Sequence, residues 1–202
     1  MSLAFVPAPR PRTVDPDAPY ADWCRRIRLG DASAFEALFR DLHPGLVRFA
    51  GGFAESTAAA DDLVQEAFVR IWERRQRLDP ERSLRALLFQ TVRNLGLNRA
   101  RDRATRREKL DGLAAEAAMA SGGGLAPDAL AEAEATRARL HAWMEELPER
   151  QREALHLTRV QGLSHEEAAR VMGVSPRTVN NHLVRALRTL RDRLQRIDPT
   201  TP

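Results

Sequence analysis

The chain has 202 residues, enough for one or two domains, and 30% of them are charged, with a formal net charge of +4. Its single cysteine, Cys24, excludes an intramolecular disulfide framework, and no apolar run approaches the ~20 residues that a membrane span needs. The N-terminus also lacks the apolar core of a signal peptide, so we expect a cytoplasmic protein without membrane insertion.

The first part of the chain predicts a proline-rich tail followed by helices. Residues 1–19 hold five prolines, which oppose a regular helix or strand, so a disordered tail is expected there. Helical periodicity begins near Tyr20, Gly30 closes a short helix, and Asp31 is placed to cap the next one. Pro44 lies inside that second helix and predicts a kink or a short break.

A third helix is predicted over about 58–77, with one apolar and one acidic face. The residues expected on its buried stripe are Leu63, Val64, Ala67, Phe68 and Ile71. The opposite face presents Asp62, Gln65, Glu66 and Glu73, with Val69 among them. Such a face suits contact with another protein, and it equally suits a solvated surface with one stray valine. The pattern alone leaves both interpretations open.

A long basic helix is predicted over about 83–107, with Ser83 as its cap. Residues 82–109 hold nine basic and two acidic side chains, a net charge of +7. The residues expected to face inward are Leu84, Leu87, Leu88, Thr91 and Leu95. Those expected to face outward are Gln90, Arg93, Asn94, Leu97 and Arg101, with Phe89 on the flank. Arginines beside an aromatic ring suit backbone neutralisation and stacking on unpaired bases.

Residues 110–128 change character and predict a flexible linker, because they are poor in bulky side chains and contain three consecutive glycines. Helical periodicity then resumes, and Pro148 begins a helix that Gly162 stops. Residues 198–202 form a short tail. No run alternates with a period of two, so we predict an all-α protein.

Residues 164–196 predict a helix-turn-helix. Ser164 and Glu167 form a capping box for the first helix, and Gly173 ends it in a left-handed conformation. Ser175 caps the second helix, whose first turn tolerates Pro176. This arrangement is the helix-turn-helix pattern.

The second helix of this motif is strongly basic on one face. Residues 175–196 hold six arginines and one aspartate, a net charge of +5. Its apolar stripe is Val179, Leu183, Ala186, Leu187, Leu190 and Leu194. Its other face carries Arg177, Asn181, Arg185 and Arg188, flanked by Thr178 and Asn180. Arg and Asn recognise base edges, and the agreement of caps, turn and charge favours a DNA reader over a merely solvated face.

The sequence carries no pattern of an enzyme. It has no glycine-rich phosphate loop, zinc-ligand spacing or nucleophile elbow, and its five histidines are scattered. Neighbouring acids such as Asp61 and Asp62 diverge by about 100° on a helix and are not poised as an acid–base pair. We therefore predict no catalytic residue, no cofactor and no metal site.

Four runs of the chain carry a resemblance to a known family. FEALFRDLHPGLVRFA, DDLVQEAFVRIW and DPERSLRALLFQTVRNLGLNRAR look like region 2 of bacterial sigma-70-family factors. LPERQREALHLTRVQGLSHEEAARVMGVSPRTVNNHLVRALRTLR looks like region 4. The brief linker between the two regions resembles the extracytoplasmic-function (ECF) subgroup. The resemblance covers about 34–194, and the combination of these runs is highly specific.

The resemblance implies two small helical domains, a region 2 bundle and a region 4 helix-turn-helix, joined by a flexible linker. The implied boundaries are a tail at 1–19, region 2 at 20–109, the linker at 110–128, region 4 at 129–197 and a tail at 198–202. It implies a sigma factor that binds core RNA polymerase through the clamp helices of the largest subunit and through the flap. Promoter DNA is the second partner, recognised and melted to start transcription. An anti-sigma factor is a further partner that the family implies, although no residue here points to it.

The resemblance also assigns roles to residues. The core polymerase contact maps to Asp61, Asp62, Gln65, Glu66 and Val69. Recognition and opening of the −10 element map to Phe89, Arg93, Asn94, Asn98 and Arg101, with the loop 79–83. Recognition of the −35 element maps to Arg177, Thr178, Asn180, Asn181, Arg185 and Arg188.

Three positions of the first basic helix, predicted over about 83–107, depart from the family pattern. Leu87 stands where a Trp is common, and its place on the expected buried stripe makes this a change of packing. Phe89 replaces a Tyr and keeps the stacking ring without the hydroxyl. Asn98 replaces an Asp and removes a negative charge beside the DNA.

The main alternative is a conventional helix-turn-helix transcriptional regulator that is not a polymerase subunit. It explains the C-terminal half only, and it leaves the DDLVQEAFVRIW face and the first basic helix without a role. A pure protein-interaction module leaves both positively charged faces unexplained.

Overall fold

The computed structural model describes residues 18–110, 139–140 and 142–197. Within these ranges the chain is all-α and contains no strand, which confirms the predicted fold class. The tail predicted at 1–19 lies outside the described residues except for its last two, which already belong to the first helix. The linker predicted at 110–128 lies outside them apart from residue 110, and the tail at 198–202 lies wholly outside.

The described N-terminal unit is a helical bundle. It consists of α1 (Ala18–Arg28), α2 (Ala32–Ala50), α3 (Thr57–Glu73), a short 3₁₀ turn η1 (Arg75–Arg77) and α4 (Leu84–Leu110). Helix α2 packs against α1, α3 and α4, so its apolar stripe forms the centre of the bundle. Leu38 and Leu46 on that stripe are fully buried. Helix α2 also runs through Pro44 without a break, because the packing of its buried residues on both sides of the proline outweighs one missing hydrogen bond.

Local side chains fix where these helices begin. The Asp31 carboxylate accepts hydrogen bonds from the backbone N–H groups of Ser33 and Ala34, as predicted for a cap. Hydrogen bonding to the Ser33 hydroxyl, then to Ala34 and Arg26, holds the pKa of Asp31 below its ordinary value. Ser83 caps α4 in the same way, since its hydroxyl accepts from the N–H of Ala86 at 3.2 Å.

The predicted orientation of α4 is partly wrong. Leu87, expected to face inward, is 38% exposed, and Thr91 is only half-buried, with its hydroxyl donating to the Leu87 carbonyl. Phe89, expected on the flank, and Val92 are 0% exposed. The reason is that α4 packs against α1, α2 and α3 and also against α7 of the C-terminal unit, so more than one of its faces is buried.

The C-terminal unit begins with helical residues 139–140 and 142–145. It continues through α6 (Glu149–Leu155), the π-helical turn η2 (His156–Val160), α7 (His165–Met172) and α8 (Pro176–Ile197). The predicted capping box is present, since Ser164 accepts from the Glu167 N–H and the Glu167 carboxylate accepts from the Ser164 N–H. Gly173 has the predicted left-handed conformation with φ 66°, and α8 crosses α7 directly after it.

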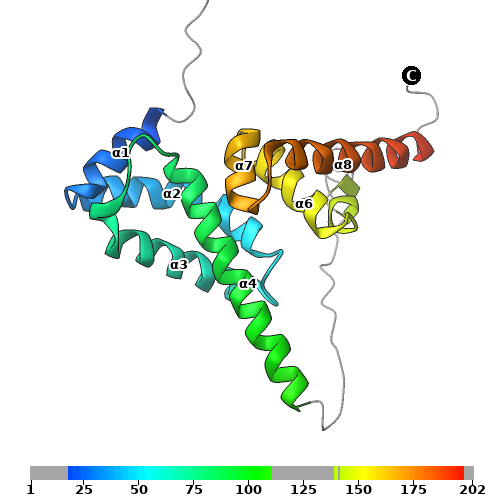
Figure 1. Ribbon diagram of the computed structural model, residues 1–202, viewed down its shortest axis with the longest axis horizontal. Helices are drawn as coiled ribbons and strands as arrows, with labels where there is room; N and C mark the ends of the chain where they lie inside the picture. The colour runs from blue at the N-terminus through cyan, green and yellow to red at the C-terminus, as the bar shows by residue number, and fades with distance from the viewer. Residues whose placement is uncertain (1–17, 111–138, 141, 198–202) are drawn as a thin grey trace, which may run out of the picture.

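Helix α8 buries a narrower stripe than predicted. Val179, Leu183 and Ala186 are buried, whereas Leu187 is 38% and Leu194 is 51% exposed. Leu183 and Ala186 pack with Leu147 and Leu155 in a small cluster of their own. The C-terminal part of α8 extends beyond α6 and α7 (Figure 1).

The two units are packed together. Figure 1 shows α4 between α1–α3 on one side and α6–α8 on the other, and α4 contacts α7 directly. Leu88 and Val92 of α4 belong to the same cluster of buried side chains as Leu163 and Val171 of the C-terminal unit. The apolar core is therefore continuous across the junction of the two units.

Candidate nucleic-acid and protein interfaces

The basic face of α8 is open to solvent. Ser175 accepts from the N–H of Thr178 at 3.1 Å, which fixes the start of the helix, and its hydroxyl lies 2.8 Å from that of Thr178. Thr178 is half-buried. The other residues predicted to contact the −35 element are exposed, namely Arg177, Asn180, Asn181, Arg185 and Arg188. A helix that presents Arg and Asn at its exposed N-terminal half suits insertion into a DNA major groove.

The predicted −10 residues of α4 divide into two groups. Asn94, Asn98 and Arg101 are exposed and follow one another along α4. Phe89 is fully buried, and its ring lies 5.2 Å from that of Phe49 in α2. Arg93 is only 7% exposed. The prediction that Arg93 faces outward and Phe89 lies on the flank is therefore wrong for this conformation.

Arg93 is buried because it forms an ion pair across the junction of the two units. Its Nε donates to the carboxylate of Glu153 in α6, and Glu153 is itself 5% exposed. Arg150 also donates to Glu153, at 3.1 Å, so one buried carboxylate holds two guanidinium groups. Sequence reasoning missed this pair, because nothing local relates residues that are 60 positions apart.

The loop before α4, predicted to help at the −10 element, is ordered by Asp79. The Asp79 carboxylate accepts from the Glu81 N–H at 3.0 Å and pairs with Arg82 at 3.4 Å. Arg82 is highly exposed, whereas Leu78 just before the loop is buried. The loop thus presents a basic side chain to solvent from an anchored backbone.

The acidic face of α3 is held by neighbouring helices. Asp61 lies 2.7 Å from His43 Nε2 of α2 and accepts from Gln65 at 2.6 Å. Glu66 accepts from Arg70 at 2.7 Å and from Arg99 of α4 at 2.5 Å. These bonds fix the carboxylates in place and offset part of their charge.

Asp62, Gln65 and Val69 point outward from α3, and Val69 is 54% exposed. Val69 lies at the rim of an open, mostly apolar groove between α2 and α3. The other residues lining the groove are Ala32, Phe35, Phe39, Gln65, Phe68 and Trp72. The rings of Phe35, Phe39 and Trp72 are only half-buried in this groove. A helix face with an exposed valine beside a groove of aromatic rings is typical of a protein-contact surface.

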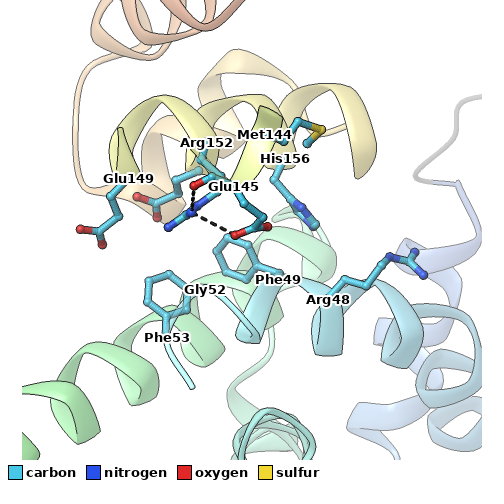
Figure 2. A pocket seen from close by; sticks show the side chains of 10 residues that line it. Arg48, Phe49, Gly52, Phe53, Met144, Glu145, Glu149, Arg152 and His156 are labelled. Carbon is cyan, nitrogen blue, oxygen red and sulfur yellow. Dashed lines mark hydrogen bonds and ion pairs between the residues drawn. The ribbon is translucent and has the colours of Figure 1, made fainter. Parts of the chain in front are cut away.

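A small cleft lies where α2 ends beside α6 (Figure 2). Phe49 and Phe53 line it from the N-terminal unit, and the rings of Phe49 and His156 are 5.7 Å apart. On the opposite wall Arg152 donates to the Glu145 carbonyl at 2.6 Å and pairs with its carboxylate at 3.0 Å. The lining mixes rings with both signs of charge and favours no one class of ligand.

Two side chains of α1 have raised pKa values. The Tyr20 hydroxyl donates to Asp41 at 2.5 Å, and burial together with this bond raises the pKa of Tyr20 to about 12. Burial also raises the pKa of the Cys24 thiol, which is 1% exposed. Cys24 is therefore a packing residue. Among the helices in the described part of the chain, none is long and apolar enough to cross a membrane.

An all-α chain whose second unit carries a helix-turn-helix with an open basic face belongs to the class of DNA-binding transcription proteins. Residues 38–106 match the family described as Sigma-70 region 2, and residues 137–190 match Sigma-70, region 4.

Individual proteins agree with these matches. The chain is 33% identical to RNA polymerase sigma factor CnrH of Cupriavidus metallidurans, over 78% of this chain and 84% of that one. It is 35% identical to ECF RNA polymerase sigma factor EcfG of Rhodopseudomonas palustris, over 71% and 75% of the two chains.

A solved structure is similar as well. It is the sigma factor RpoE in complex with the anti-sigma factor NepR from Bartonella quintana, with a TM-score of 0.61, 25% identity, and coverage of 80% of this chain and 96% of that one. The chain belongs to the sigma-70 family of RNA polymerase sigma factors, in the ECF subgroup. It binds core RNA polymerase and directs promoter recognition and transcription initiation. The alternative hypothesis, a conventional helix-turn-helix transcriptional regulator, is not favoured.

Proposed function

We propose that this sigma factor is a non-catalytic, cytoplasmic initiation subunit. It would contact its promoter at the −10 and −35 elements, and the polymerase at the clamp helices of the largest subunit and at the flap. The domain boundaries that we propose are region 2 at 20–109 and region 4 at 129–197. The main observation behind separate roles for the two regions is the open basic face of α8. Four of its residues are exposed together, namely Arg177, Asn181, Arg185 and Arg188. We assign to this face, with Thr178 and Asn180, the recognition of the −35 element.

The polymerase contact in this proposal is the outward face of α3. Asp62, Gln65 and Val69 would touch the clamp helices of the largest subunit directly. Asp61 and Glu66 would contribute from positions that His43 and Arg99 already fix. The apolar groove beside Val69 supports this assignment, because it offers area for a partner helix next to the polar contacts.

The −10 contact in this proposal has an exposed part and a hidden part. Asn94, Asn98 and Arg101 are accessible and can approach DNA as they stand. Arg93 has to leave Glu153 before it can reach a phosphate or a base. Phe89 has to leave the core before it can stack, so we assign it a contact only in a rearranged promoter complex.

We also propose an anti-sigma factor as a partner of this chain. The support is the similar sigma factor RpoE, whose structure was solved with the anti-sigma factor NepR. Such a partner would compete with polymerase for at least one of the surfaces above.

Co-purification tests the proposal as a whole. The full chain should bind core RNA polymerase in stoichiometric amounts, and the reconstituted holoenzyme should protect −10 and −35 sequences of one genomic promoter in a footprint. The chain alone should give no such footprint at the same concentration. A footprint produced by the chain alone, with no binding to the core enzyme, would instead establish the conventional regulator.

A further inference from the structure

An exposed apolar side chain lies within the basic face of α8. It is Val184, which is 48% exposed. Val184 comes four residues after Asn180 and four residues before Arg188, and both of these are exposed. Residues four apart lie on the same face of a helix, one turn from each other. Val184 therefore lies inside the surface assigned to the −35 element and not at its edge.

The other exposed aliphatic side chains of α8 have a different position. Leu187 is 38% and Leu194 is 51% exposed. At ~100° per residue both lie within about 40° of Leu183, which is buried against Leu147, whereas Val184 lies about 100° from Leu183. Packing within the described part of the chain therefore accounts for the two leucines as the margin of the buried stripe, but it does not account for the exposure of Val184.

The chemistry of the major groove limits what an aliphatic side chain can contact there. Guanine presents two acceptors, adenine an acceptor and a donor, and cytosine an amino donor. An apolar group pressed against any of these leaves a polar atom without a hydrogen-bond partner, which is costly. Thymine alone adds a methyl group, at C5, and that methyl group is the apolar partner that a valine fits.

The side chain of Val184 is also suited to such a contact by its stiffness. A valine in a helix has one strongly preferred χ1 rotamer, so its two γ-methyl groups have a nearly fixed direction. Little rotamer entropy is lost when they meet a base, and a base of the wrong shape is not easily accommodated by a change of rotamer.

We propose that Val184 is a specificity-determining residue of the −35 contact, and that its γ-methyl groups pack against the C5-methyl group of one thymine of the −35 element. The inference rests on the proposed function, because that function places α8 in the major groove of this element. Val184 lies ~4.5 Å along the helix axis from Asn181, at 1.5 Å per residue, and base pairs are ~3.4 Å apart. The thymine should therefore lie within about two base pairs of the position whose recognition Asn181→Ala changes.

Replacing thymine by uracil tests the contact, because this exchange removes only the C5-methyl group and keeps the base pair. The reconstituted holoenzyme is titrated with promoter duplexes that carry one such exchange at a time in the −35 sequence protected in the footprint, on either strand. At one position the exchange should raise Kd about fourfold, as expected for the loss of one buried methyl contact. Exchanges at the other thymines of the −35 sequence should change Kd by less than about twofold.

Variants at Val184 show whether this side chain is the one that senses the methyl group. Val184→Ser removes both γ-methyl groups, and serine and valine have similar helix propensities, so helix content by circular dichroism should be kept. It should bind the thymine and uracil promoters equally, with an unchanged salt dependence because no charge is lost. Val184→Thr keeps one γ-methyl group and should keep a preference for thymine of about twofold or more. Val160→Ser is the matched control, because Val160 is a 47% exposed valine outside α8, and it should keep the full preference.

The ratio of the two affinities separates recognition of the base from damage to the helix. A Val184→Ser holoenzyme that binds both promoters more weakly but keeps the wild-type ratio would overturn the proposal. A −35 sequence without thymine on either strand, or a wild-type holoenzyme that is indifferent to every exchange, would overturn it as well. Loss of core-enzyme binding in Val184→Ser, with the thymine preference intact, would assign Val184 to a protein contact instead. A chain that binds the promoter without core enzyme, and prefers thymine only while Val184 is present, would refute the proposed function and leave the thymine contact supported.

Discussion

Replacing Val69 by Asp should weaken binding to core RNA polymerase without unfolding the sigma factor. Val69 is 54% exposed, so about half of its side-chain surface remains for a partner to cover. Burying a whole valine contributes ~1.5–3 kcal/mol, so this half contributes about 1 kcal/mol. An unpaired polar group placed against the apolar groove costs a further ~1–3 kcal/mol. We therefore expect a loss of about 2–4 kcal/mol, or roughly 30- to 700-fold in Kd.

Titration of a fluorescently labelled chain with core enzyme, read by anisotropy, measures this loss. Leu29→Asp is the matched control, because Leu29 is an 89% exposed aliphatic of the same unit that lies outside the groove. Substitution at Glu66 is a poorer test, because Glu66 is bonded to Arg99 and its loss would disturb α4. A Val69→Asp chain that melts like the wild type and binds within twofold of it would refute the docking assignment.

Three further perturbations probe other parts of the account. Arg185→Ala should weaken holoenzyme binding to promoter DNA by ~1–3 kcal/mol if the guanidinium contacts a base. If the guanidinium contacts a phosphate, the substitution should instead reduce the salt dependence of binding by a slope of about one. A gel-shift salt series that shows neither change would exclude Arg185 from the DNA interface. Ser164→Ala removes one half of the capping box and should cost about 1 kcal/mol, lowering Tm by ~2–4 °C in calorimetry; an unchanged Tm contradicts the role of the cap. Tyr20 is the single tyrosine, so absorbance at alkaline pH reads its ionisation alone. Its pKa of about 12 lies above the unfolded value near 10, so its contribution to stability is present below pH ~10 and is lost as the pH rises to about 12, and Tyr20→Phe should abolish that loss in urea melts at rising pH.

The sequence predicted the features that short-range chemistry decides. Asp31 and Ser83 begin their helices as caps, and Gly173 ends α7 with a positive φ, because each depends on residues within one turn of the chain. The exposure of Val69 followed from helical periodicity alone.

The orientation of α4 could not be predicted in the same way. Periodicity assigns one buried face to a helix, whereas α4 packs on its own bundle and on α7 as well. Arg93 is buried by Glu153, and Phe89 by a core that includes Phe49, and neither neighbour is marked by local spacing. Leu87 is exposed because it lies beside the faces of α4 that pack against other helices.

Run-off transcription with purified core enzyme tests the central claim most directly. Core polymerase supplied with this chain should start transcription at one defined position on a promoter from its own genome, and core alone should not. Arg185→Ala should reduce that transcript, and Val69→Asp should nearly eliminate it at equal protein concentration. A chain that binds DNA yet never starts a specific transcript with core enzyme on any of those promoters would contradict its role as a sigma factor.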